Sequence, residues 1–440
     1  MVKYKLKYID SCHAACDISH CRRVWETGQY RRWNMGILEK VLIVRNVAKR
    51  DMSEPFAVAA ASRHAATRWG AGFETMAAPA AVSAPPELRL DTATLTPKEI
   101  LDSSRGPDVV GIAPPMATML VRPVTESAPG PVWGLDAVGA TRSAYTGKGA
   151  VVAVLDTGID KSHPAFSGVA IEEKDFSGCG NGDVQGHGTH CAGTIFGGSA
   201  NGVRIGIAPG VKKALVGKVF DDSGPGSTEM IVEGVLWALQ QGANIISMSL
   251  GLDFSGQVAH YVAAGMPVEA ATSKTLEAYR ANVQLFDNLF ALAVDNAVWD
   301  QGTLCIAAAG NSSDRPRYVI GAGLPAAAKN IISVGAVEQA EGGKYAVTYF
   351  SNTYPQIVAP GAQVTSAVPG GGLGAKSGTS MACPHVAGVA ALWWETLAQG
   401  MPSALRARMV QAKLLGTARG NVFAPGDDPA DLGTGLVTAP

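Results

Sequence analysis

Three short segments each contain one of the groups that nucleophilic catalysis by a serine requires, namely a carboxylic acid, an imidazole and a hydroxyl. Asp156 ends the apolar run of VVAVLDTGID, His187 lies in GHGTHCAGT, and Ser380 lies in SGTSMACPHVAG. A serine hydroxyl is a weak nucleophile until a neighbouring base takes its proton, and a histidine, with a reference pKa of about 6.5, suits that task. A carboxylate can then orient the imidazole and stabilise the imidazolium. Together the three segments predict an Asp/His/Ser catalytic triad.

Each segment by itself also has a purely structural interpretation. An Asp after an apolar strand is often a helix N-cap, a His in GHGTH can be a hydrogen-bonded core residue, and Gly-Thr-Ser is a common turn. The joint occurrence of all three segments, each rich in glycine and small residues, favours catalysis over these alternatives.

The elements that must position these residues belong to an α/β pattern. From about residue 132 to the C-terminus, helix-length patterns alternate with apolar runs of strand length, namely VVAVLD, ALVGKVF, NIISMSL, TLCIAAAG and IISVGAV. Runs that are apolar on both faces indicate strands of a parallel sheet covered by helices on each side. The sequence therefore predicts a doubly wound α/β domain whose site lies at the carboxyl ends of the strands, where Asp156 and Asn311 stand.

The remaining ranges predict additions to this domain. Residues 1–51 are expected to be a poorly ordered extension, or to precede a start at Met52. Residues 52–122 contain an Ala-, Ser- and Pro-rich stretch and then a small α+β unit, in which Thr96 and Pro97 begin a short helix. Residues 123–131 are expected to be an exposed linker, and residues 252–301 an inserted segment with a long amphipathic helix.

Composition excludes several classes of function. The 440 residues carry a net charge of −1, so no basic field attracts nucleic acid. No apolar run reaches the roughly 20 residues of a membrane span, and the N-terminus has no signal-peptide pattern. Seven cysteines cannot all pair within the chain. Cys12, Cys16 and Cys21, with two nearby histidines, match no common zinc spacing, so no metal site is expected there.

The chain resembles the subtilisin-like serine proteases (subtilases, peptidase family S8) over roughly residues 133–436. The motifs DTGID, GHGTH and GTSMACPH match the three active-site motifs of that family in the same order. The order Asp, His, Ser differs from the order Ser, Asp, His of the α/β-hydrolases. The resemblance implies a serine endopeptidase that forms an acyl-enzyme with Asp156, His187 and Ser380.

Further site residues are implied by the same resemblance. Asn311 stands where the family keeps the amide of its oxyanion hole. Ser249, Leu250 and Gly251 match the strand that binds the substrate backbone, and Ala309 and Gly310, which precede Asn311, are also expected to bind the substrate. The small unit before the linker resembles the end of a family propeptide, with cleavage expected between Pro123 and Pro131.

Two departures from the family pattern concern metals and thiols. Relatives with a tight calcium site carry an Asp after the His-Pro pair, whereas here Ala165 follows His163 and Pro164. No cofactor is therefore expected to be required, although other calcium sites stay open. Cys191 is expected behind His187, and Cys383 stands where relatives more often carry Ala, Ser or Thr.

The expected partners are polypeptide substrates and the chain's own propeptide-like segment. We expect no nucleic-acid partner and no membrane span, and we expect the protein to be a monomer. Two alternatives keep the fold. A transpeptidase or macrocyclase would resolve the acyl-enzyme with an amine, and a non-catalytic peptide-binding module would need no triad. The resemblance suggests secretion, with an intracellular location as the alternative.

Overall fold

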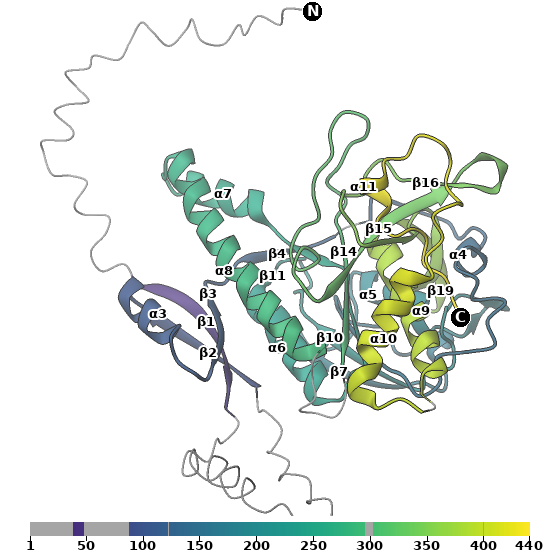
Figure 1. Cartoon of the computed structure of the whole chain (residues 1–440), viewed down its shortest axis with the longest axis horizontal. Coiled ribbons are helices and arrows are strands. Elements are labelled where there is room, and N and C mark those ends of the chain that lie inside the picture. The colour runs from purple at the N-terminus through teal and green to yellow at the C-terminus, as the bar shows by residue number, and fades with distance from the viewer. Residues whose placement is uncertain (1–37, 48–87, 122, 295–301, 399) are drawn as a thin grey trace, which may run out of the picture.

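The computed structural model describes residues 38–47, 88–121, 123–294, 302–398 and 400–440 of the chain. Within these ranges a small unit of strands and one helix lies beside a larger body built on a central sheet (Figure 1). The cysteine cluster at Cys12, Cys16 and Cys21, most of residues 1–51, and the end of the 252–301 segment lie outside the described residues.

The central sheet has eight strands in the order β16-β15-β14-β12-β6-β10-β7, with β17 also pairing with β15. All pairs are parallel except that of β15 with β16. The strands are β6 (Val151–Asp156), β7 (Ala170–Asp175), β10 (Lys213–Lys218), β12 (Ile245–Met248), β14 (Leu304–Ala308), β15 (Ile331–Gln339), β16 (Tyr345–Val347) and β17 (Ile357–Pro360).

Both faces of this sheet are buried, and β6 shows why its sequence is apolar throughout. Val152 and Val154 pack into the hydrophobic cluster on one face, whereas Ala153 and Leu155 pack into the cluster on the other. Successive side chains of a strand point to opposite faces, so a sheet covered twice requires an unbroken apolar run. The predicted doubly wound α/β fold is confirmed.

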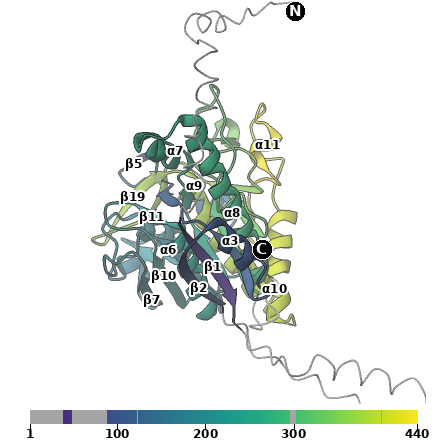
Figure 2. The same ribbon diagram turned by 90° about the vertical axis from the view of Figure 1, so that its left-hand side faces the viewer.

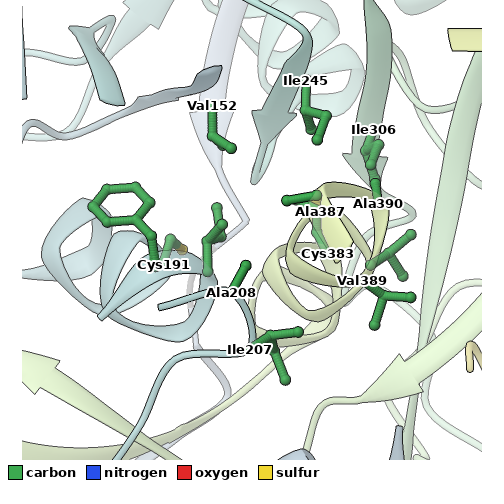
Figure 3. Close-up of a cluster of buried hydrophobic side chains, with 14 of the residues drawn as sticks. Val152, Cys191, Ile207, Ala208, Ile245, Ile306, Cys383, Ala387, Val389 and Ala390 are labelled. Atoms are coloured by element: carbon green, nitrogen blue, oxygen red, sulfur yellow. The ribbon is translucent and has the colours of Figure 1, made fainter. Parts of the chain in front are cut away.

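Helices cover the two faces of the sheet. The first face packs against α5 (His187–Phe196), α9 (Thr379–Thr396) and α10 (Ser403–Gly416), and the second against α6 (Thr228–Gln240) and α8 (Val268–Val294). Figure 3 shows the contact between α5 and α9, where Cys191, Cys383 and Ala387 lie together above Ile207 and Ala208. These small side chains allow the two helices to approach closely beneath the sheet.

The small unit is an antiparallel sheet in the order β2-β1-β3 with one helix. It consists of β1 (Glu39–Asn46), β2 (Leu88–Leu95), α3 (Pro97–Ser103) and β3 (Val109–Ala113). The side chain of Thr96 accepts a hydrogen bond from Glu99 N, and the Glu99 carboxylate accepts one from Thr96 N, which is a capping box. The expectation that residues 1–51 form an extension outside the folded units is wrong for β1, whose four buried apolar residues make it the central strand.

The small unit contacts the larger body through α6 and α8, which separate it from the sheet in Figures 1 and 2. Asn288 Nδ2 donates to Val110 O at 2.7 Å, and Asn282 Nδ2 donates to Pro114 O at 2.9 Å. Lys40 forms an ion pair with Glu229 of α6 at 2.7 Å. The small unit is therefore held over the helices that cover the second face of the sheet.

The 252–301 segment contains α7 (Phe254–Ala263) and the long helix α8. Phe286, Phe290 and Val294 of α8 are buried as the helical periodicity predicts, but Leu276 is 48% exposed because the first half of α8 extends beyond the sheet. No helix in the described part of the chain is long and apolar enough to cross a membrane.

Shorter elements complete the body. They are β4 (Ala117–Leu120), β5 (Thr125–Ser127), α4 (Trp133–Ala137), η2 (Pro164–Phe166), β8 (Ser199–Ala200), β9 (Val203–Arg204), β11 (Gly226–Ser227), β13 (Leu250–Leu252), η3 (Glu341–Gly343), β18 (Val364–Val368), β19 (Gly372–Ser377) and α11 (Pro429–Leu432). The expected linker at 123–131 contains β5, which pairs with β19, so it is part of the folded body.

The packing of α9 predicts the effect of a single added methyl group. A Cβ at Gly388 would lie 2.5 Å from the Cβ of Ile207, so Gly388→Ala is expected to lower the free energy of unfolding by about 1–3 kcal/mol. Gly416→Ala is the control, since a Cβ at that end of α10 meets nothing within 4 Å. Urea denaturation of both variants measures the difference, and an unchanged stability of Gly388→Ala would contradict the packing argument.

Candidate active site

Asp156 is the last residue of β6, at the carboxyl edge of the sheet, and it is fully buried. Its Oδ1 accepts hydrogen bonds from His187 Nδ1 at 2.7 Å and from Thr157 N at 2.7 Å. The bond to Nδ1 fixes the orientation of the imidazole, so that Nε2 faces away from the carboxylate.

His187 is the first residue of α5, which starts against the end of β6. A Cβ at Gly188 would lie 2.1 Å from Gly158 O, so the approach of the helix to this loop requires glycine. Asp183 holds the start of the helix, because its carboxylate accepts from Gly186 N and from Thr189 N at 2.8 Å each. Sequence reasoning missed Asp183, although an acidic residue just before a helix start is a recognisable capping signal.

Ser380 is the second residue of α9, and it is buried beside the same edge of the sheet. Its Oγ donates a hydrogen bond to Val121 O at 2.5 Å. His187 Nε2 is buried without a hydrogen-bond partner among the described residues. The structure thus brings the acid, the imidazole and the hydroxyl into one site, with the hydroxyl engaged by a carbonyl of an upstream segment.

Cys191 and Cys383 are buried thiols behind these residues. Cys191 Sγ lies 3.9 Å from His187 Nδ1 and 3.4 Å from Ser380 O. Burial raises the pKa of Cys191 well above its ordinary value and raises that of Cys383 to about 11. Both thiols are therefore neutral at physiological pH and pack as small side chains.

Asn311 follows β14 and is oriented by the start of α9. Its Oδ1 accepts from Thr379 N and from Thr379 Oγ1, each at 2.8 Å. These bonds fix the carbonyl side of the amide toward Thr379 and turn the NH₂ group away from it. The Nδ2 atom lies 2.8 Å from the position that a Cβ on Gly378 would take, next to the turn that precedes Ser380.

Ala309 and Gly310 connect β14 to Asn311. Ala309 N donates to Val334 O at 2.9 Å, which extends the sheet by one residue. Gly310 has a φ of 116°, and a Cβ there would lie 2.4 Å from Asn352 Nδ2. The backbone therefore turns at a position that only glycine can occupy, and this turn presents Asn311 to α9.

Ser249, Leu250 and Gly251 lie next to an extended segment of the chain itself. β4 pairs with β13 in antiparallel register, with Leu250 opposite Leu120 and Gly251 opposite Met119. On its other edge β4 pairs with β11, so it is the middle strand of a three-stranded sheet. Ser249 Oγ donates to Ser380 O at 3.1 Å, which ties β13 to the helix that carries Ser380.

The extended segment continues past Ser380. Val124 N donates to Ser377 O at 2.7 Å, and β5 then pairs with β19, which leads into α9. Segments upstream and downstream of Val121 thus lie on both sides of Ser380. We call residues 117–121 and 123–127 the cleft segment. Sequence reasoning missed its course, because short strands of ordinary composition do not indicate their partners.

Among the described residues, one group of side chains has the types and spacing that a metal ion could bind. Asp156, His187 and Cys191 form one group with ligand atoms within 4.8 Å of one another, but its carboxylate and imidazole are already joined by a hydrogen bond. Ala165, which follows His163 and Pro164, is a buried residue whose methyl group offers no oxygen ligand.

His190 is a second buried histidine of α5, one turn beyond His187. Its Nε2 lies 2.9 Å from Val364 O and 3.2 Å from Gly374 O, so Nε2 carries the proton, and Nδ1 has no hydrogen-bond partner among the described residues. Burial lowers the pKa of His190 to about 3, with the positive charge of Lys376 as a smaller cause. His190 is therefore a neutral structural donor.

Comparison with known proteins gives a consistent result. The model of the subtilase family matches residues 147–435. The "Major intracellular serine protease" of Bacillus subtilis (strain 168) is 36% identical over 254 residues, which are 56% of this chain and 68% of that protein. "Subtilisin E" of the same organism is 32% identical over 308 residues, which are 68% of this chain and 69% of that protein. The "Thermophilic serine proteinase" of Bacillus sp. (strain AK1) is 34% identical over 249 residues, 56% and 52% of the two chains.

The low pKa of His190 predicts a pH dependence of stability. Between about pH 6.5 and pH 3 the unfolded chain binds a proton at this residue and the folded chain does not, so stability is lost as the pH falls through this window. The expected slope is about 1.4 kcal/mol per pH unit. In His190→Gln, whose amide can still donate to Val364 O, this part of the slope should disappear between about pH 6.5 and pH 4.

Urea denaturation across that pH range measures the slope. His260→Gln is the matched control, since this histidine is exposed on α7 and its replacement should leave the slope unchanged. Equal slopes for the wild type and His190→Gln would show that His190 does not resist protonation in the folded state.

Proposed function

The chain belongs to the subtilase family of serine endopeptidases, and on this premise we propose that Ser380, His187 and Asp156 act as its catalytic triad. Ser380 Oγ attacks the carbonyl carbon of a substrate peptide bond while His187 Nε2 accepts the hydroxyl proton. Asp156 holds the imidazole through the 2.7 Å bond to Nδ1 and stabilises its protonated form. The imidazolium then protonates the leaving amine, and water resolves the acyl-enzyme.

Asn311 and the start of α9 are proposed to stabilise the oxyanion. The bonds from Thr379 to Oδ1 fix the orientation of the Asn311 amide, whose NH₂ group would donate to the oxyanion. The N–H of Ser380 is in the first turn of α9, where backbone donors have no partner within the helix. In subtilisin, itself a member of this family, loss of the corresponding amide lowers kcat by about 100- to 1000-fold, and the same magnitude is carried over to Asn311→Leu.

The substrate backbone is proposed to bind as an added strand. β13 and β11 leave room for one strand between them, and β4 now takes that place. Main-chain hydrogen bonds to Leu250 and Gly251 would supply affinity that is independent of sequence. Val121 Cγ2 lies 3.8 Å from the position of a Cβ on Gly251, so the residue before the cleaved bond would sit beside Gly251. Ser249, Ala309 and Gly310 hold this binding wall in place.

The cleft segment is proposed to be the enzyme's own first substrate and inhibitor. Its carbonyl at Val121 accepts a hydrogen bond from Ser380 Oγ, which places this peptide bond next to the proposed nucleophile. The small unit that precedes it, bound to α6 and α8, acts as the propeptide. Cleavage would then fall between Val121 and Arg122, one residue before the 123–131 range expected from the sequence.

No cofactor is required by this proposal. The triad and the two oxyanion donors are protein groups, and Ala165 gives no ligand for calcium at the position that relatives use. The observation that supports the proposed function most directly is the geometry around Ser380. Its hydroxyl donates a hydrogen bond to Val121 O, directly after β4, the strand that lies between β11 and β13.

A fluorophosphonate probe tests the nucleophile. We expect labelling of the enzyme once it has been cleaved between Val121 and Arg122, no labelling of Ser380→Ala, and unchanged labelling of Ser255→Ala, an exposed serine of α7. Mass spectrometry of peptide products distinguishes hydrolysis, which adds one water, from transfer to an amine. Labelling that survives in Ser380→Ala would contradict the assignment of the nucleophile.

The cleavage site gives a second test. We expect the N-terminal sequence of the active enzyme to begin at Arg122, because the carbonyl of the preceding residue, Val121, is the one that accepts the hydrogen bond from Ser380. Ser380→Ala should keep its intact N-terminus. An active enzyme whose new N-terminus lies within 123–131, or which remains uncleaved, would show that Val121 is not the residue before the scissile bond.

A further inference from the structure

The downstream half of the cleft contains a buried cation with a specific partner. The side chain of Lys376, in β19, is 8% exposed, and its Nζ lies 2.5 Å from Glu126 Oε1. Glu126 belongs to β5, and its side chain is 60% exposed. Within the described part of the chain, Glu126 is the carboxylate within ion-pair distance of Lys376. The cation, Lys376, is therefore fixed on β19, whereas the anion, Glu126, belongs to the cleft segment that lies along β19.

This ion pair follows from strand register. Lys376 and Glu126 are directly opposite in the antiparallel pair of β19 and β5. Opposite residues of such a pair have their Cβ atoms about 4.5–5.5 Å apart on the same face of the sheet. The adjacent pair is also polar, since Thr125 Oγ1 donates to Ser377 Oγ at 2.8 Å. Any chain that lies along β19 in this register must place one particular side chain against Lys376.

The position of that side chain can be counted from the proposed scissile bond. With Arg122 as the first residue after the bond, Glu126 is the fifth. A cavity of about 340 Å³ lies along this path, and its walls are Gln185, His187 and Lys376 on the body together with residues 123–126 of the cleft segment. The path thus runs continuously from the proposed base, His187, to the ammonium group of Lys376.

We propose that Lys376 is a specificity-determining residue that selects an acidic side chain at the fifth position after the cleaved bond. The proposal rests on the proposed function, because it assumes that substrates replace the cleft segment in the same register. Cleavage before Arg122 leaves Glu126 on the new N-terminal strand of the enzyme, so a substrate must displace this strand from β19. The ammonium group of Lys376 then loses its carboxylate partner, and an acidic substrate residue restores the pair. A basic residue there would meet a like charge at close range, which disfavours its binding.

Competing peptides test this selection. Three peptides carry the sequence of residues 117–128, ATMLVRPVTESA, with Glu, Gln or Lys at the position of Glu126. They are mixed and digested together by the self-processed enzyme, and mass spectrometry gives the ratios of kcat/KM, which do not depend on the active fraction. The wild type should prefer the Glu peptide over the Lys peptide by about fivefold or more at low salt, with a smaller ratio at high salt.

Charge variants assign the preference to one residue. Lys376→Glu should reverse the order of the Glu and Lys peptides, and Lys376→Gln should remove the preference. Lys213→Glu makes the same change of charge at the opposite end of the sheet, where Lys213 begins β10, and it should keep the wild-type order.

Cleavage of the Gln peptide distinguishes a failure of the proposed role of Lys376 from a failure of the proposed peptidase function. If the wild type cleaves it but cuts all three peptides equally, or if Lys376→Gln keeps the preference, the role of Lys376 is overturned and the peptidase function stands. If the folded wild type cleaves none of the peptides and no fluorophosphonate labels Ser380, the proposed function fails, and the role of Lys376 fails with it.

Discussion

The close contact of α5 with α9 beneath one edge of the sheet is the constraint on which the site depends. His187 begins one helix and Ser380 lies at the start of the other, so their distance is set by how near the two helices can come. Small buried side chains of both helices, such as Cys191 and Cys383, lie in this region. Larger side chains would separate the helices and with them the two catalytic groups, since packed cores have little free volume.

Burial of the polar groups at that edge has an energetic cost that the surroundings offset. Asp156 and His187 are almost fully removed from water, and a buried polar group without partners is strongly destabilising. Hydrogen bonds from Thr157 and from the imidazole satisfy one carboxylate oxygen, while Asp183 anchors the helix start that carries the imidazole. The geometry of the triad is thus maintained by contacts outside the triad itself.

The cleft segment lies across the same site. It enters as the middle strand between β11 and β13, passes Ser380 at Val121 and leaves along β19. Because main-chain pairing requires no particular side chains, one groove can hold both an internal segment and foreign peptides. Side-chain contacts such as that of Lys376 are proposed to discriminate among the chains that fit.

The fold class and the family could be predicted from the amino-acid sequence alone, and the same motifs lead to the proposed reacting residues. Apolar runs buried on both faces require a covered parallel sheet, and the motifs around Asp156, His187 and Ser380 are local enough to be recognised in the linear chain. The position of Asn311 was also predictable, because its Ala-Gly-Asn segment follows a strand directly.

Only the tertiary structure decided which distant segments pair. β1 contains the apolar run VLIV, but its place as the central strand of the small unit depends on partners supplied from residues 88–95 and 109–113. The course of the cleft segment and the pairing of Lys376 with Glu126 depend on strand register over a separation of about 250 residues. Such long-range pairing leaves no local pattern, since it arises from edges that become neighbours only after the chain has folded.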